Sequence, residues 1–199
     1  MPVLSVAGKT ILFIHVPKTG GRAVERHFKE HGNVSFEHTL SRELGLRCIP
    51  MHFHGALLES LFHPSLFDHV FMVVRNPIDR AVSGYRYLVR RRQLADNPPN
   101  FSRWLRYRLF RASLNPYYMD NHFRPQLEFE CFDTAVYRFE DGLSAPIVDM
   151  NAKLGTQVPE DLPRVNEAAP VEVHVREADK ELIYGRYRED FERFGYQKD

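Results

Sequence analysis

The chain is poor in cysteine, has almost no charge imbalance and has no long apolar run. Its 199 residues include only two cysteines, Cys48 and Cys131, with no CxxC pair and no paired Cys/His spacing. We therefore expect free thiols in a reducing compartment and no zinc site. The formal net charge is +1, so the overall electrostatics favour neither nucleic acid nor an anionic membrane as a partner. Any anion must be bound by a local cluster of cations.

The sequence also lacks a basic segment followed by an apolar one at its start, and it lacks the roughly 20 consecutive apolar residues that a membrane span needs. These absences predict a soluble, cytoplasmic protein with no membrane partner. The composition is 43% hydrophobic and 13% aromatic, which suits a substantial core. We expect one globular domain over residues 1–199.

Short apolar runs alternate with segments of helical period along the chain. The pattern predicts strands at 10–16, 68–75 and 134–139, and helices at 22–31, 56–62, 77–92, 101–114, 142–154 and 177–194. Residues 34–45 and 162–175 read as less regular connections. The alternation predicts an α/β fold with a central parallel sheet flanked by helices. In such folds ligands bind at the carboxyl ends of the strands.

The first predicted strand runs into a turn suited to anions. Its residues are Lys18, Thr19, Gly20 and Gly21, and a helix then opens at Arg22-Ala23. Backbone N–H groups converge at a helix N-terminus, and glycine lets a phosphate approach the main chain. The turn is not a GxxxxGK[ST] P-loop, because the lysine precedes the glycines. A phosphate cradle and a plain glycine turn are both open interpretations at this point.

The strand predicted at 68–75 ends in a second candidate anion site. Arg75 is followed by Pro77, well placed in the first turn of a helix, and by Ser83 about two turns into it. A guanidinium offers two parallel donors to a phosphate, and a serine hydroxyl can add a third. An ion pair between Arg75 and Asp79 is the structural alternative. Both turns should lie at the same edge of the sheet.

Together the two stretches resemble the PAPS-dependent sulfotransferases, and specifically the carbohydrate-type group. The resemblance implies a P-loop-NTPase-like sulfotransferase fold, 3′-phosphoadenosine 5′-phosphosulfate (PAPS) as donor, adenosine 3′,5′-bisphosphate (PAP) as product, and no metal. It also implies that residues 18–23 hold the 5′-phosphosulfate and that Arg75 and Ser83 hold the 3′-phosphate. Softer matches lie at 52–54, 121–126, 137–141, 162–166 and 187–196.

The sequence departs from that family at Arg22-Ala23, where a threonine or serine is usual. Thr19 retains a hydroxyl in the turn, and Arg22 could supply a guanidinium for the lost contact. Eukaryotic secretory members of the family also carry a membrane anchor. The absence of an anchor in this sequence favours a bacterial protein or an excised domain.

Histidines are the candidate general bases, since an imidazole with a pKa near 6.5 can accept a proton at neutral pH. His52 and His54 are spaced like the histidine pair of hexuronyl 2-O-sulfotransferases, and in an extended segment both side chains would point the same way. A purely structural pair is the alternative. His15 is expected to be a hydrogen-bonded core residue. His122 and Arg124 are weaker candidates for substrate contacts.

The stretch from 80 to 111 is rich in arginine and interleaved with aromatic residues. Such a surface suits an anionic sugar chain, and it would also suit single-stranded nucleic acid, although solvated helix faces explain most of these residues equally well. Apart from Asp96 the stretch holds almost no acid, so its local field should be positive.

The sequence therefore predicts a sulfotransferase that moves the sulfuryl group of PAPS to an acceptor hydroxyl, on a carbohydrate. Lys18 would stabilise the leaving phosphate, and His52 or His54 would be the base. Nucleic acid is not an expected partner. Two alternatives stay open: a nucleotide- or glycan-binding module of the same fold that has lost transfer, and a small-molecule kinase. The kinase is disfavoured because the Walker spacing is missing.

Overall fold

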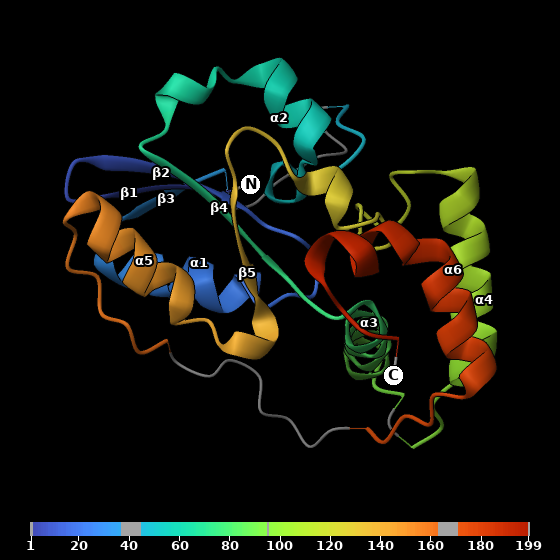
Figure 1. Ribbon diagram of the computed structural model, residues 1–199. Helices are drawn as coiled ribbons and strands as arrows, with labels where there is room; N and C mark the ends of the chain where they lie inside the picture. The colour runs from blue at the N-terminus through green and yellow to red at the C-terminus, as the bar shows by residue number, and fades with distance from the viewer. Residues whose placement is uncertain (1, 37–44, 95, 163–170, 199) are drawn as a thin grey trace.

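The computed structural model describes residues 2–36, 45–94, 96–162 and 171–198. It contains a five-stranded sheet in the order β3-β1-β2-β4-β5, with helices packed against it (Figure 1). The strands are β1 (Val3–Val6), β2 (Lys9–Ile14), β3 (Asn33–Ser35), β4 (His69–Val74) and β5 (Ala135–Arg138). Strands β2, β4 and β5 are parallel, whereas β1 is antiparallel to both β2 and β3. The α/β class is confirmed, and the sheet is mixed and not wholly parallel.

Central strand β2 is buried on both faces, as its continuous apolar run predicts. Ile11 and Phe13 face one layer, and Leu12 and Ile14 face the other. Strand β4 alternates in the same way, so each face of the sheet presents a continuous apolar surface. This is the pattern that allows helices to cover both sides of a parallel core.

Two helices cover one face of the sheet and one covers the other. Helices α1 (Gly21–His31) and α5 (Ala145–Leu154) pack on the face of Ile11 and Phe13, and α2 (Gly55–Leu61) packs on the opposite face (Figure 1). Short 3₁₀ segments at Pro50–His52, Pro64–Leu66, Leu127–Phe129 and Phe139–Asp141 connect the layers. Each helix buries a stripe of aliphatic and aromatic side chains.

Three further helices form a separate cluster to one side of the sheet. They are α3 (Pro77–Arg91), α4 (Phe101–Leu114) and α6 (Glu177–Phe194), which pack around their own apolar core (Figure 1). Asn76 caps α3 by accepting the Ile78 N–H, and Pro77 occupies its first turn as predicted. Asn100 caps α4 through the Arg103 N–H.

The predicted strands and helices are confirmed within a few residues at each end. Strands β1 and β3 were not predicted from the sequence. Strand β1 pairs with β2 through a tight turn at Ala7-Gly8, where both residues have positive φ, the geometry of a two-residue hairpin. Parts of the two connections predicted as irregular, at 37–44 and 163–170, lie outside the described residues.

Strand register brings the carboxyl ends of the parallel strands together. Ile14 of β2 is opposite Met72 of β4, and Val74 of β4 is opposite Arg138 of β5. The turn after Ile14 and the residues after Val74 therefore share one edge of the sheet, as predicted. Within the described residues, no helix has the length and apolar character needed to cross a membrane.

Candidate active site

The turn between β2 and α1 is held in a conformation that exposes the helix N-terminus. Lys18 and Gly20 have positive φ values of 75° and 87°. The buried Thr19 hydroxyl donates to the Val16 carbonyl at 2.9 Å, so this hydroxyl closes the turn. No described side chain caps α1 at Gly20. The Ala23 N–H already donates to the Gly20 carbonyl at 2.8 Å, so it is the N–H groups before Ala23 that are left for a ligand or for water.

Both glycines of the turn are required by close packing. A Cβ on Gly21 would lie 2.3 Å from the His15 ring, and one on Gly20 would lie 2.9 Å from both Leu143 and Phe139. His15 is buried, with Nδ1 2.6 Å from Glu25 Oε1 of α1. The prediction that His15 is a hydrogen-bonded core residue is confirmed. It ties the start of α1 to strand β2.

Lys18 lies in a concentration of positive charge. Its ammonium is 4.1 Å from the centre of the Tyr87 ring. Burial, followed by the charges of Arg90, Arg75 and Arg22, lowers the pKa of Lys18 to about 8. No carboxylate contributes to this shift at Lys18. At Arg75, burial lowers the pKa and the charges of Asp79 and Glu140 oppose that effect. Arg22 is itself exposed in the first turn of α1. An anion bound here would relieve the mutual repulsion.

Arg75 extends from the end of β4 into the same region. Its guanidinium stacks over the Phe139 ring at 4.4 Å, and its Nε is buried without a hydrogen-bond partner. Its main chain is fixed on both sides by the Gln126 amide, at 2.9 and 2.8 Å. Among the described residues Arg75 makes no ion pair with Asp79, so the structural alternative is not formed. Ser83 lies half-buried in the second turn of α3.

Arg80 is a residue of this site that the sequence did not indicate. It is 4% exposed, and its guanidinium donates to the carbonyls of Pro17 at 3.0 Å, Arg124 at 2.9 Å and His122 at 3.3 Å. Arg80 therefore joins the β2–α1 turn to the segment at 122–124. In the sequence it belongs to an arginine-rich stretch whose members otherwise look solvent-facing, so no signal distinguished it.

The two candidate bases occupy different surroundings, although only one residue separates them. His52 ends a 3₁₀ turn, and its ring centre is 5.0 Å from those of both His15 and His122. His54 precedes α2 and packs against Tyr117 at 5.6 Å. Burial lowers the pKa of His54 to about 4, with Arg124 contributing, and its Nδ1 is buried without a partner. The expectation that both face one cleft stays a prediction, because these contacts give only the neighbours of each ring.

His52 is held by an aspartate that the sequence did not indicate. Its Nδ1 is 2.5 Å from Asp120 Oδ2, and the other oxygen of Asp120 accepts the Ile49 N–H at 2.7 Å. Asn121 donates to the His52 carbonyl at 2.9 Å. Residues 119–121 all have positive φ, between 49° and 62°, which costs roughly 1 kcal/mol or more for each such residue. The strained segment therefore serves to position His52.

His122 and Arg124, the predicted substrate contacts, differ in whether the side chain could reach a ligand. His122 lies beside Lys18 and His52, and burial and these two charges lower its pKa to about 3. Arg124 is 7% exposed, and its guanidinium is bonded to Asn121, Glu128 and the Pro116 carbonyl. Arg124 thus supports the loop that carries Asp120, whereas His122 faces the cavity described below.

One group of side chains could hold a metal ion. His52, Asp120 and His122 each offer a ligand atom, and these atoms lie within 4.8 Å of one another. The sequence spacing did not predict this grouping. A metal there would compete with the His52–Asp120 hydrogen bond for the same carboxylate.

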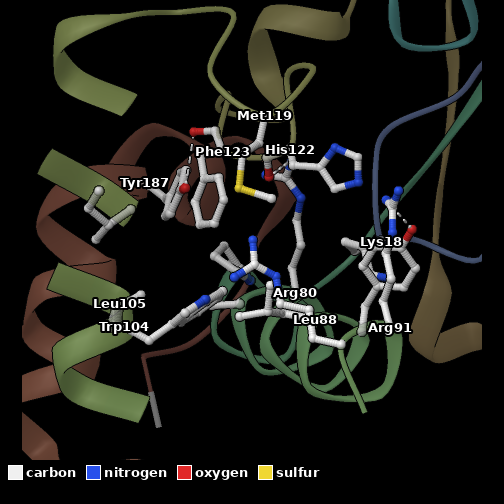
Figure 2. A pocket seen from close by; sticks show the side chains of 16 residues that line it. Lys18, Arg80, Leu88, Arg91, Trp104, Leu105, Met119, His122, Phe123 and Tyr187 are labelled. Atoms are coloured by element: carbon white, nitrogen blue, oxygen red, sulfur yellow. Dashed lines mark hydrogen bonds between the residues drawn. The ribbon is translucent and has the colours of Figure 1, made fainter. Parts of the chain in front are cut away.

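A cavity of about 430 Å³ opens beside Lys18, between helices α3, α4 and α6 and the loop at 119–123 (Figure 2). Lys18 and His122 line one part of it, and Trp104 and Leu105 line another. The site thus combines a cationic edge suited to an anionic ligand, a histidine oriented by a carboxylate, and an enclosed space next to both. This arrangement can bind a polyanion and remove a proton from a neighbouring group.

Comparison with known proteins assigns the chain to a family. The model of the "Sulfotransferase family" matches residues 6–197. A crystal structure of a sulfotransferase from Alicyclobacillus acidocaldarius is similar over 69% of this chain, with 19% identity and a TM-score of 0.43. The similar part covers 55% of that protein, so the chain spans about half its length. Comparison with curated proteins finds no match.

Proposed function

The chain belongs to the sulfotransferase family, and on this premise we propose that it transfers the sulfuryl group of PAPS to a hydroxyl of a carbohydrate acceptor. The observation that carries the proposal is the cluster of Lys18, Arg22, Arg75 and Arg90, in which the charges of the three arginines add to burial in lowering the pKa of Lys18. A nucleotide with a phosphosulfate at one end and a phosphate at the other matches this positive charge at two points.

The donor would lie along the shared edge of β2 and β4. The free N–H groups at the start of α1 and the ammonium of Lys18 suit the 5′-phosphosulfate. Arg75 suits the 3′-phosphate, because its Nε is buried without a partner and Phe139 holds its guanidinium plane. Ser83 would donate to the same phosphate. Gly20, Gly21 and Ala23 contribute backbone and close packing, and Thr19 fixes the turn.

Transfer would proceed in line. The acceptor oxygen forms a new bond to sulfur while the bond from sulfur to the 5′-phosphate oxygen breaks, and PAP leaves with the bonding electron pair. His52 Nε2 takes the acceptor proton. Its Nδ1–H donates to Asp120, which selects the tautomer with a free lone pair at Nε2. Lys18 stabilises the charge that develops on the leaving phosphate oxygen. Neither bond change requires a metal.

Hydrogen bonding supports His52 over His54 as the base. A base needs an orienting partner and access to the acceptor, and His52 has Asp120 on one side and the cavity-lining His122 on the other. His54 has no hydrogen bond at Nδ1, and its lowered pKa makes it a weak proton acceptor. Arg124 acts through the Asp120 loop and not on the acceptor.

Calorimetry with PAP tests the donor assignment. We expect wild-type protein to bind PAP and the Arg75→Ala variant to bind it at least about tenfold more weakly, the loss that a charged hydrogen bond of 1.5–3 kcal/mol predicts. Arg103→Ala, at an exposed arginine on α4, is the matched control. Unchanged PAP affinity in Arg75→Ala would sink the assignment.

Labelled sulfate tests the transfer itself. Wild-type protein is incubated with PAPS labelled in the sulfuryl group and with sugar acceptors, in the presence of EDTA. Label on an acceptor is the expected result, and it excludes the inactive-module alternative. Binding of PAP without label on any hydroxyl compound would instead favour that alternative.

A further inference from the structure

The cavity beside Lys18 is built mainly from apolar side chains. One face of α3 supplies part of its wall, α4 supplies a second part, and the loop at 119–123 closes it (Figure 2). The apolar lining includes Ala81, Leu88, Trp104, Leu105, Met119 and Phe123. Its position is fixed from α6, where the Tyr187 hydroxyl donates to the Phe123 carbonyl at 3.1 Å. The cavity is thus a defined feature of the packed helices.

The cavity meets the proposed donor site at one residue. Lys18 lines it, whereas residues 19–23, Arg75 and Ser83 do not. In Figure 2 Lys18 and His122 lie on one side of the space, and Trp104 and Leu105 lie across from them. A molecule in the cavity would therefore reach the transfer point without overlapping the nucleotide. This is the placement expected of an acceptor.

The polar groups are distributed unevenly around this space. Lys18 and His122 lie on one side, and the ring centre of His122 is 5.0 Å from that of His52. Across from them the lining is aliphatic and aromatic, and Trp104, 7% exposed, keeps its Nε1 buried without a hydrogen-bond partner. A sugar ring placed there would lose hydration at each hydroxyl with few hydrogen-bond partners in return. An alkyl or aryl group would lose nothing.

We infer that the acceptor is an amphiphile, a sugar joined to an alkyl or aryl aglycone, and not a free glycan chain. The aglycone fills the apolar part of the cavity. The sugar hydroxyl then lies between Lys18 and His52. This inference rests on the proposed function, because it assigns the second substrate of the same transfer. A volume of about 430 Å³ is in the range of small-molecule sites.

The chain carries its own probe for this site, since Trp104 is its single tryptophan. Protein saturated with PAP is titrated with n-octyl β-D-glucoside below its micelle concentration, and Trp104 emission is followed. We expect a saturable change with octyl glucoside and none with glucose or maltose at equal concentration. An equal response to free maltose, or no saturable response to octyl glucoside, overturns the inference.

A filled cavity provides the structural control. An added Cβ at Gly84 would lie 3.8 Å from the Trp104 ring, so Gly84→Leu extends into the space without a backbone clash. Gly185→Leu, at an exposed glycine of α6 whose Cβ meets nothing within 4 Å, is the matched variant. We expect at least tenfold weaker octyl glucoside binding in Gly84→Leu and no change in Gly185→Leu. Equal binding by both variants overturns the inference. If Gly84→Leu does not fold, Gly84→Ala replaces it, with Gly185→Ala as control.

Transfer assays separate this inference from the proposed function. With labelled PAPS, we expect kcat/KM for octyl glucoside to exceed that for maltose at least tenfold. Equal values for the two acceptors overturn the amphiphile and leave the sulfotransferase standing. Octyl glucoside binding without label on any acceptor has the opposite meaning: the cavity assignment stands and the proposed transfer falls.

Discussion

The proposed donor edge, formed by residues 18–23 with Arg75 and Ser83, and the apolar cavity beside Lys18 are adjacent but are built in opposite ways. Each half of the donor edge is a continuous stretch in which a strand ends and a helix begins. The cavity takes its walls from α3, α4, α6 and a loop, segments that are up to about a hundred residues apart. Local backbone geometry forms the donor edge, whereas the cavity exists only because distant segments pack together.

The two regions also differ in the kind of ligand that they favour. Burial, followed by the charges of nearby arginines, lowers the pKa of Lys18 at the proposed donor edge, which favours an anionic ligand. The cavity offers mainly aromatic and aliphatic walls, which favour a ligand with matching shape and apolar area. We propose that the two motifs specify the reaction and that the tertiary structure specifies the acceptor. Four experiments test this division.

The largest effect is expected at Lys18, where the two regions meet. Lys18→Met should lower kcat by about 10³-fold, since it removes the cation at the leaving oxygen, while PAP binding survives weakly. The melting temperature of the same variant should rise, because the substitution removes a buried charge that neighbouring cations repel. The expected rise is roughly 2–4 °C for each kcal/mol gained in this way. Transfer assays and calorimetric melting measure both changes. Lys153→Met, at an exposed ion pair with Asp149, is the control. A lower melting temperature in Lys18→Met would contradict the electrostatic picture.

The next effect separates His52 from His54. His52→Ala should lower kcat by about 10²-fold, the usual contribution of a general base, and added imidazole should restore part of it. Because burial lowers the pKa of His54 to about 4 and its Nδ1 has no hydrogen-bond partner, His54→Ala should lower kcat much less and should not respond to imidazole. Loss of activity in both variants with imidazole rescue only in His54→Ala would reverse the assignment.

The pH dependence of donor capture should follow Lys18. The pKa of Lys18 is lowered to about 8. The side chain therefore carries a positive charge below that pH and loses its proton and its charge above it. We expect kcat/KM for PAPS to fall up to tenfold for each pH unit above about 8. In Lys18→Arg the side chain stays charged, so this alkaline limb should disappear. An identical limb in both proteins would assign it to another group.

The smallest effect concerns Ser83. Its hydroxyl would add one hydrogen bond to a phosphate that Arg75 already holds, so Ser83→Ala should weaken PAP binding about fivefold, near 1 kcal/mol. Combined with Arg75→Ala, the loss should be less than additive because both groups bind one phosphate. Calorimetry on the two single variants and the double variant gives the coupling. Fully additive losses would place the two residues on different parts of the ligand.

The parts of the site that sequence could predict are those whose geometry is local. Lys18 and Arg75 stand at the ends of strands that apolar runs reveal, and parallel pairing puts such ends at one edge. Asp120 and Arg80 could not be predicted, because their contacts join segments that are far apart in the sequence. Asp120 meets His52 across 68 residues, and Arg80 reaches Pro17 across 63; neither contact has a sequence period or spacing.

The α/β class and the glycine turn between β2 and α1 follow from the sequence alone, because strand periodicity, glycine and helix starts act over a few residues. Tertiary structure gave His52 and His54 different surroundings, since Asp120 and Tyr117 come from a distant loop. It also turned apolar positions of α3 and α4 into cavity walls. Apolar periodicity looks the same whether a neighbouring helix fills the space or leaves it open for a ligand.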